Sequence, residues 1–339
     1  MIENERTGIL HDGYTGEKAM KKMVCGLLLI ALCLTVCGCG FAVRDSYPNA
    51  DKYTIGNFTY DAAAVEAVEI NWTAGRVEVK ESTGTTLSVT EKTDKLTEDQ
   101  LMRWWLDGKT LRIQYWKSGY TGTLKDVQKR VTVEIPKDIA LTVNVTSGEI
   151  ITGDHQLKDV ALKATSGEIE LGALDAEEIL VEVTSGSIEA GALRAKKQIK
   201  MNCTSGKIKL VNAMADAVAL QSTSGNISSG PIDAKTFNAQ CTSGDTELDA
   251  VKAEEARIKT TSGDITIGLY RCGQVEIGCT SGDIRLSAVH GSGMTVDYST
   301  NSGSLNGKGG GKSYHEVIGD GASAVTVSTT SGDLKLAEK

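Results

Sequence analysis

Apolar and polar residues alternate along most of the chain in a pattern that repeats every 19 residues, with one step of 20. Each repeat carries the triplet Thr-Ser-Gly, and apolar residues lie five and three positions before its Thr, as Val160 and Leu162 do before Thr165. A second alternating stretch follows the triplet and begins with an apolar residue such as Ile169. Alternation with a period of two predicts a strand with one buried face, so each repeat is predicted to contain two strands.

The spacing of the triplets predicts the fold class. The nine threonines are Thr146, Thr165, Thr184, Thr204, Thr223, Thr242, Thr261, Thr280 and Thr330. A period near 20 residues is typical of a solenoid, in which each coil covers its apolar side by stacking on its neighbours. The sequence therefore predicts an all-β fold, a single-stranded parallel β-helix with coils of 19–20 residues and a small irregular excursion near its N-terminus.

A column of small residues lies eleven positions after the Thr of most repeats. Its members are Ala176, Ala195, Ala215, Ala234, Ala253, Cys272 and Gly291. We interpret this column as a tight corner between successive coils.

The N-terminal part of the repeat region departs from the pattern. Val68 and the triplet-like Thr73-Ala74-Gly75 predict a first coil that begins near residue 66, before an excursion that ends where Leu141 resumes the register. Within the excursion, the capping-box sequence from Thr97 to Gln100 predicts a short helix that includes Trp104 and Trp105. Asp107-Gly108 before an alternating stretch predicts a hairpin.

At the other end, Thr300-Asn301-Ser302-Gly303 is a drifted copy of the triplet, and the coil at Thr330 is predicted to close the rod. We divide the chain into a signal or anchor segment (1–39), a linker (40–64), an N-terminal coil with its capping excursion (65–140) and the β-helix repeat domain (141–339).

The first residues predict export and attachment to a membrane. Basic Lys21 and Lys22 precede the apolar run 24–36, and a small residue precedes Cys39, as in a lipobox. Bacterial lipoproteins are acylated on such a cysteine, so Cys39 is the predicted lipidation site and Met20 the predicted true start. The uncharged run 23–43 is also long enough for an uncleaved membrane anchor. Both alternatives place the rod outside the cytoplasm.

Charge and cysteine usage narrow the function classes. A net charge of −8 argues against a nucleic acid partner, because no basic stripe is available to meet phosphates. Cys203, Cys241 and Cys279 recur two coils apart, about 10 Å at twice the strand spacing, which is too far for a disulfide. No CxxC occurs and the chain has 4 His, so neither a metal site nor a cofactor is predicted.

Two groups of residues are weak candidates for a site. Asp245, Asp264 and Asp283 occupy the same position in successive coils and could offer oxygen ligands to a divalent cation, although Asp after Gly more often caps a turn. The four tryptophans all lie before residue 117 and form either a recognition patch or a plug for the open end of the core: Trp72, Trp104, Trp105 and Trp116. No His accompanies the Ser and Thr columns, so no catalytic residue is predicted.

These motifs resemble one known family. The recurring Thr-Ser-Gly-Asp/Glu-Ile, the stretch from Val133 to Pro136 and the segment from Gly319 to Gly321 ahead of the last triplet are similar to the bacterial adhesin-type β-strand-repeat family of unknown function. The resemblance covers residues 53–339. It implies a bacterial envelope protein and supplies no catalytic or binding motif.

Three hypotheses follow. The first is a non-enzymatic, lipid-anchored surface protein whose rod serves adhesion to an envelope or host component, a glycan or a protein. The second is a sensor or scaffold of envelope-stress signalling that partners another membrane protein. The third, an enzyme acting on polysaccharide, has the least support, because no acid pair recurs along the outward positions.

Overall fold

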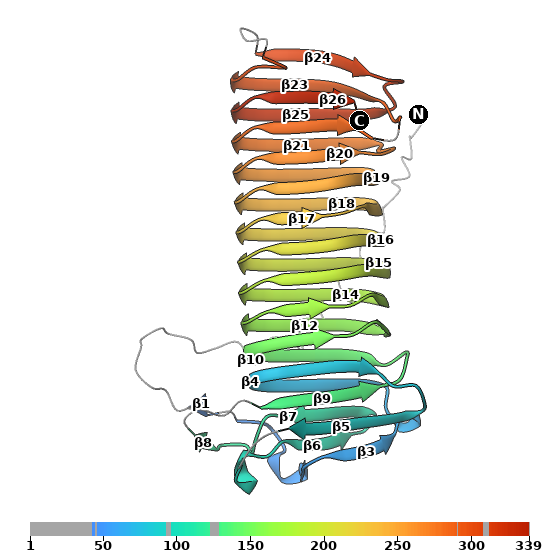
Figure 1. The fold of residues 1–339 in the computed structure, drawn as a ribbon, viewed down its shortest axis with the longest axis vertical. Coiled ribbons are helices and arrows are strands. Elements are labelled where there is room, and N and C mark those ends of the chain that lie inside the picture. The colour runs from blue at the N-terminus through green and yellow to red at the C-terminus, as the bar shows by residue number, and fades with distance from the viewer. Residues whose placement is uncertain are drawn as a thin grey trace, which may run out of the picture. The chain divides into compact units, whose positions relative to one another are not determined.

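The predicted repeat becomes a stack of parallel strands (Figure 1). The computed structural model describes residues 43–338 except 45, 93–95, 123–128, 290 and 308–311, so the predicted signal segment and Cys39 lie outside the described residues. β12 (Asp159–Ser166) pairs in parallel with β10 (Ala140–Thr152) and β14 (Leu174–Ser185). Val160 thereby lies between Leu141 and Ile179, each 19 positions away. The parallel β-helix is confirmed.

The remaining strands of the column continue this register. They are β11 (His155–Gln156), β13 (Ile169–Leu171), β15 (Ile188–Ser205), β16 (Ile208–Ser224), β17 (Ile227–Ser229), β18 (Ile232–Ser243), β19 (Thr246–Ser262), β20 (Ile265–Leu269), β21 (Gln274–Ser281) and β22 (Ile284–Ala288). The single 20-residue step is absorbed as a register shift between Arg194 and Gln198. Every other side chain points inward, so Ile179, Val181 and Ile188 are fully buried in a continuous core.

The glycine of each triplet is required by the close spacing of the coils. Gly167 has φ of 146°, and a Cβ there would lie 1.7 Å from the carbonyl oxygen of Gly148 in the adjacent coil. Its N–H donates to the carbonyl of Ser185 at 2.8 Å. A residue without a Cβ is therefore needed at this position in every coil.

Antiparallel strands close the N-terminal end of the column. β4 (Ala67–Glu81) stacks on β10 with Val68 opposite Leu141, as predicted. On its other side β4 pairs in parallel with β7 (Thr110–Gln114) and β9 (Arg130–Ile135). Antiparallel β6 (Arg103–Asp107) and β2 (Thr54–Ile55) extend β7, and antiparallel β5 (Thr86–Lys92) and β3 (Phe58–Asp61) extend β9. We call β2, β3, β5, β6, β7 and β9 with their connections the cap.

Short elements complete the cap. They are the 3₁₀ turns η1 (Ala50–Lys52), η2 (Ala62–Ala64) and η3 (Glu98–Gln100), and a separate antiparallel pair of β1 (Val43–Arg44) with β8 (Thr121–Gly122). β2 and β3 lie in the stretch 40–64, which is predicted to be a linker. β2 pairs with β6 and β3 pairs with β5, so this part of the stretch belongs to the cap.

The predicted helix at Thr97 is wrong beyond its first turn. The capping box between Thr97 and Gln100 is present, but it opens a 3₁₀ turn of three residues. Trp104 and Trp105 lie on β6 instead, because the predicted hairpin at Asp107-Gly108 pairs β6 with β7. Strand pairing along five residues outweighs the local helix signal.

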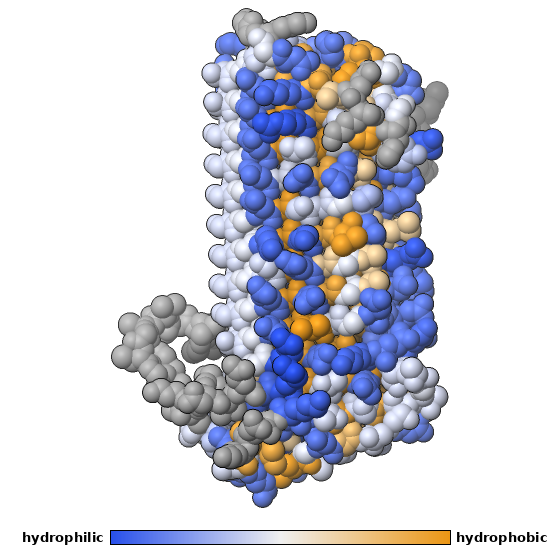
Figure 2. All heavy atoms as spheres, viewed as in Figure 1, coloured by the Kyte–Doolittle hydropathy of each residue, from blue (hydrophilic) through white to orange (hydrophobic). Residues whose placement is uncertain are grey.

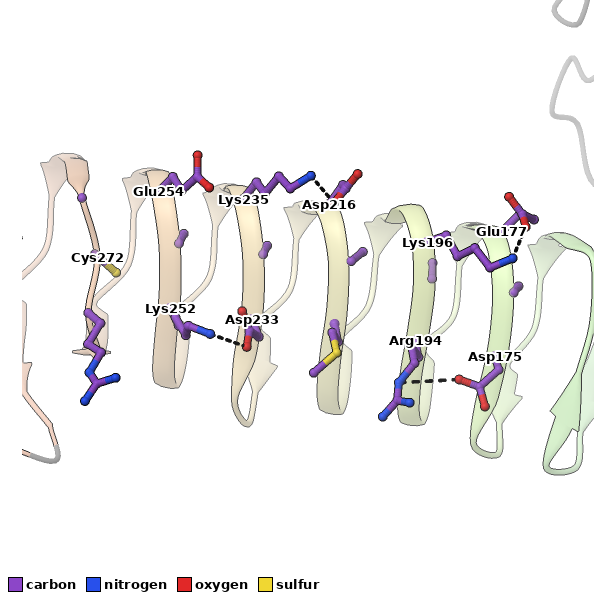
Figure 3. A pocket seen from close by; sticks show the side chains of 18 of the residues that line it. Asp175, Glu177, Arg194, Lys196, Asp216, Asp233, Lys235, Lys252, Glu254 and Cys272 are labelled. Atoms are coloured by element: carbon purple, nitrogen blue, oxygen red, sulfur yellow. Dashed lines mark hydrogen bonds and ion pairs between the residues drawn. The ribbon is translucent and has the colours of Figure 1, made fainter.

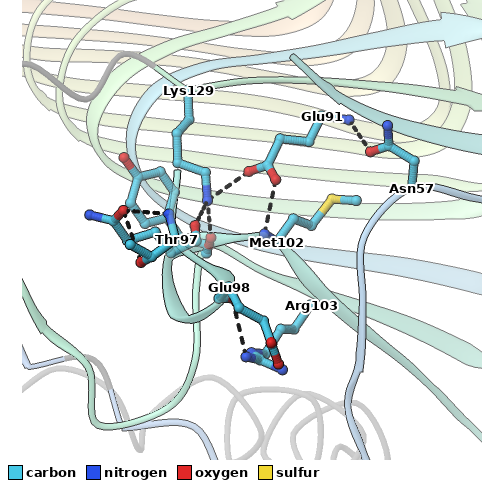
Figure 4. Close-up of polar contacts among 9 residues, drawn as sticks. Asn57, Glu91, Thr97, Glu98, Met102, Arg103 and Lys129 are labelled. Atoms are coloured by element: carbon cyan, nitrogen blue, oxygen red, sulfur yellow. Dashed lines mark hydrogen bonds and ion pairs between the residues drawn. The ribbon is translucent and has the colours of Figure 1, made fainter. Parts of the chain in front are cut away.

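A buried ion pair fills the interior of the cap (Figure 4). Lys129 Nζ lies 2.7 Å from Glu91 Oε1, with both side chains almost fully buried. The ammonium also donates to the carbonyl oxygens of Gln100 and Tyr115 and lies 4.1 Å from the centre of the Tyr115 ring. Glu91 accepts the N–H of Met102 at 3.0 Å. Burial lowers the pKa of Lys129 to about 8.

The prediction that the Thr330 coil closes the rod is wrong. β25 (Ser323–Ser331) inserts between β21 and β23 (Met294–Ser302), so Ser331 lies between Ser281 and Ser302. β26 (Leu334–Glu338) continues this coil by pairing with β22. Antiparallel β24 (Ser313–Ile318) then covers the free side of β23. The two last triplets share one register, so the period alone could not order them.

Candidate functional site

A groove of about 1110 Å³ runs along the column, parallel to the direction of coil stacking. Its floor is the column of small residues, and its walls are the residues on either side of them in each coil (Figure 3). The floor consists of Ala176, Ala195, Ala215, Ala234, Ala253 and Cys272. One wall carries Asp175, Arg194, Met214, Asp233, Lys252 and Arg271, and the other carries Glu177, Lys196, Asp216, Lys235 and Glu254.

Strand alternation explains this cross-section. The small floor residue points inward, as Ala215 and Ala253 do, and both of its neighbours point outward. Because the same arrangement recurs in each coil, the two outward columns become parallel walls. The predicted corner residues are therefore the floor of a groove.

Ion pairs link neighbouring coils within each wall. Asp175 pairs with Arg194 at 3.7 Å and Asp233 with Lys252 at 2.8 Å on one wall. Glu177 pairs with Lys196 and Asp216 with Lys235 on the other. All of these side chains are partly or largely open to solvent, where a single ion pair adds little stability, so a charged ligand can exchange with them at small cost.

The ion pairs of the groove shift the pKa values of several of its side chains. The hydrogen bond to Lys196 holds the pKa of Glu177 below its ordinary value. The pKa values of Lys196 and Lys235 are raised by their carboxylate partners. These groups therefore stay charged near neutral pH, and each wall carries both positive and negative side chains.

One apolar side chain interrupts the charges midway along the groove. Met214 lies on one wall between Arg194 and Asp233, and it is 46% exposed. The groove thus offers one apolar contact, at Met214, between charged side chains.

The aspartate column is an internal capping ladder. The carboxylate of Asp245 accepts the N–H of Asp264 at 2.9 Å, and Asp264 accepts that of Asp283 at 2.9 Å. Asp283 in turn accepts the N–H of Asp333 at 3.0 Å. The backbone hydrogen bond from Asp283 lowers the pKa of Asp264. Among the described residues, no group of three or more His, Cys, Asp or Glu is placed to hold a metal ion.

The four tryptophans do not share one surface. Trp72 and Trp116 are buried, with Tyr115 between them at ring distances of 4.9 and 4.8 Å. Half-buried Trp104 stacks on Phe58 at 4.0 Å and packs against the core. Only Trp105 points away from the core. The alternative of a plug for the open end therefore describes Trp72, Trp104 and Trp116.

The thiols and hydroxyls differ in exposure. Cys203, Cys241, Cys272 and Cys279 are free and buried, and burial raises the pKa of each thiol. Cys203 Sγ donates to the carbonyl of Gly186 at 3.2 Å, which is a structural role. The Ser residues of the triplets, and nearly all of their Thr residues, are instead exposed along one edge, visible as a pale column in Figure 2.

Residues 65–229 and, again, 197–337 match the Toastrack DUF4097 family. The chain belongs to this family. Among curated proteins, none matches the chain. In the part of the Toastrack chain that the structure describes, no helix is long and apolar enough to cross a membrane.

Several solved structures are similar to this Toastrack chain. A "putative adhesin" from Parabacteroides merdae is 13% identical over 84% of this chain and 96% of that one, with a TM-score of 0.43. A "putative adhesin" from Parabacteroides distasonis is 13% identical over 84% and 97%, with a TM-score of 0.40. A "putative lipid binding protein" from the same species is 14% identical over 83% and 97%, with a TM-score of 0.37.

Sequence reasoning missed the groove of this Toastrack domain. The signal was present, because charged residues flank the small column in coil after coil, as Asp233 and Lys235 flank Ala234. A column position alone does not show whether its neighbours enclose a volume.

Proposed function

We propose that this protein is a non-enzymatic binding module of the bacterial surface that holds an extended polymer in the groove. The observation that carries the proposal is the length of the groove. Leu157 lines the groove 19 positions before Ala176, so the lining from Leu157 to Cys272 spans seven coils, about 29 Å at the spacing of parallel strands. A compact small molecule would touch one or two coils, whereas a linear polymer can touch all of them.

The chemistry of the walls supports binding rather than turnover. Hydrolysis of a polysaccharide commonly uses two carboxyl groups that converge on one bond. In the groove, the carboxylates of Asp175, Glu177, Asp216 and Asp233 each form an ion pair with a basic side chain of the adjacent coil. The thiols of the described residues are buried and protonated, which does not favour a nucleophile.

The N-terminal sequence supports display outside the cytoplasm. The lipobox at Cys39, or the alternative anchor 23–43, would tether the chain to a membrane. The partner would then be a glycan or protein of the envelope or of a host surface. The acidic composition does not favour nucleic acid.

Sedimentation of the full chain with isolated cell-wall material, and separately with host matrix proteins, tests this proposal. We expect saturable binding to one of them. The double variant Arg194→Glu/Lys252→Glu places like charges beside Asp175 and Asp233 and should weaken binding about tenfold, equivalent to about 1.4 kcal/mol.

The matched control is Lys209→Glu/Lys335→Glu, which changes the net charge equally at exposed positions outside the groove. Equal weakening by the two double variants would contradict a groove site. No binding to either material would refute the proposal and favour the signalling scaffold.

A further inference from the structure

One aromatic pair in the cap has no role in the core. Trp105 lies on the outward face of the β6–β7 hairpin, opposite Arg112. Its ring meets Tyr53 edge to face at 5.6 Å, and Lys52 Nζ lies 4.7 Å from its centre. Neither Trp105 nor Tyr53 packs into the hydrophobic core, although Trp104 on the opposite face of the same strand does. Both rings are half-buried, so their outer surfaces meet solvent.

Charges around this pair are largely neutralised. Arg112 forms ion pairs with Glu69 and Asp107. Asp51 precedes Lys52 in the chain. The outward face therefore combines a Trp, a Tyr and a Lys with little net charge, the side chains that gather where proteins meet the headgroup layer of a bilayer.

Tyr47 fixes the first part of the described chain to the cap. The N–H of Tyr47 donates to Ser118 Oγ at 2.9 Å, and Ser118 Oγ donates back to the carbonyl of Tyr47 at 3.2 Å. Seven residues separate Tyr47 from Cys39, which an extended chain spans in at most about 29 Å. The last residue of the alternative anchor, Val43, itself lies on β1, which pairs with β8.

We propose that Lys52, Tyr53 and Trp105 form a contact with the lipid headgroups of the bilayer that carries the chain's own anchor. This inference rests on the membrane attachment in the proposed function. The short tether keeps the cap near that bilayer under either anchor. Aromatic burial in the headgroup layer drives the contact, and Lys52 stays at the water-facing side of Trp105. The aromatic end of the column thus faces the membrane.

The test uses the full chain in phosphatidylcholine vesicles that contain a lipid brominated near the headgroup. Flotation of the vesicles reports attachment, and quenching of tryptophan fluorescence reports contact. We expect the full chain to float and its emission to be quenched. The Trp105→Phe variant should float equally and lose the larger part of the quenching. The Lys52→Glu variant keeps all tryptophans and should also show weaker quenching than the native chain.

Trp116→Phe is the matched control, because Trp116 is 1% exposed and should contribute little quenching. A chain that floats without quenching, or a Trp105→Phe chain quenched as strongly as the native one, overturns the contact and leaves the anchor standing. A chain that does not float overturns anchor and contact together. Binding of polymers by the groove is measured separately and is independent of these outcomes.

Discussion

At the scale of single residues, the triplet glycine is the most constrained position. Gly225 has φ of 142°, and a Cβ there would lie 2.0 Å from the carbonyl oxygen of Gly206. The clash is with backbone, so neighbouring side chains cannot relieve it. The Thr and Ser of the triplet are exposed and carry no such requirement. The triplet therefore recurs in each coil because its glycine position admits no Cβ.

We expect Gly225→Ala to lower the free energy of unfolding by more than about 2 kcal/mol, because two adjacent coils must separate to admit the methyl group. Urea denaturation followed by circular dichroism measures this. Gly84→Ala is the control, since nothing lies within 4 Å of a Cβ there. It should change the free energy by less than about 0.5 kcal/mol. Similar losses in both variants would contradict the steric argument.

At the scale of elements, the sequence predicts the coils and misses how they end. In each coil the positions of Val160 and Val181 must hold an apolar side chain that points into the core. Because this requirement recurs in coil after coil, the sequence alone predicts the strands. The cap occurs once, and its hairpins compete with local signals such as the capping box at Thr97. The sequence also does not predict that β25 inserts beside β21, because β25 pairs there in the same register that the predicted order would give. The repeat predicts that the aspartates share one column, but it does not show that each carboxylate accepts a backbone N–H from the next coil.

The ion pair of Glu91 and Lys129 makes the cap sensitive to single substitutions. Glu91→Gln or Lys129→Met leaves one buried charge without its partner and should each lower the free energy of unfolding by about 3–5 kcal/mol. The double variant should recover most of that loss, because two apolar or neutral groups of similar size need no desolvated charge. Thermal unfolding of the four proteins measures the coupling. Additive losses in the double variant would show that the two charges do not interact.

The same pair gives a pH dependence with a defined sign. Lys129 has a pKa of about 8 when folded and 10.5 as its ordinary value. Between these two pH values the unfolded chain binds the proton more tightly, so the contribution of Lys129 to the free energy of unfolding rises with pH. Lys129→Met should lack this rise when unfolding is measured across that range. An identical pH profile for both proteins would contradict the lowered pKa.

At the scale of the whole molecule, the groove exists only because coils stack. One coil contributes a small residue and two outward neighbours, which enclose nothing by themselves. Stacking turns them into a floor and two walls whose ion pairs, such as Asp216 with Lys235, join successive coils. Length of groove is therefore proportional to the number of coils, and so is the contact area for a linear ligand.

Excision of one whole repeat tests this modular design. Removing residues 223–241 joins Ser222 to Thr242 and keeps every later residue in its column. Because stability in a solenoid is a sum over coils and their interfaces, this variant should fold cooperatively with a modest loss, and polymer binding should weaken as the groove loses one level. Circular dichroism, thermal unfolding and the sedimentation assay measure the three effects.

Removing residues 223–240 is the matched control, since it differs by one residue. Cys241 then remains, and the preceding strand shifts by one position relative to the triplet, which turns Val218 and Leu220 from the core toward solvent. This chain should lose the cooperative transition. Equal folding of the two deletions would show that the 19-residue register does not govern the stack, and unchanged binding by the shorter column would show that a ligand occupies only part of the groove.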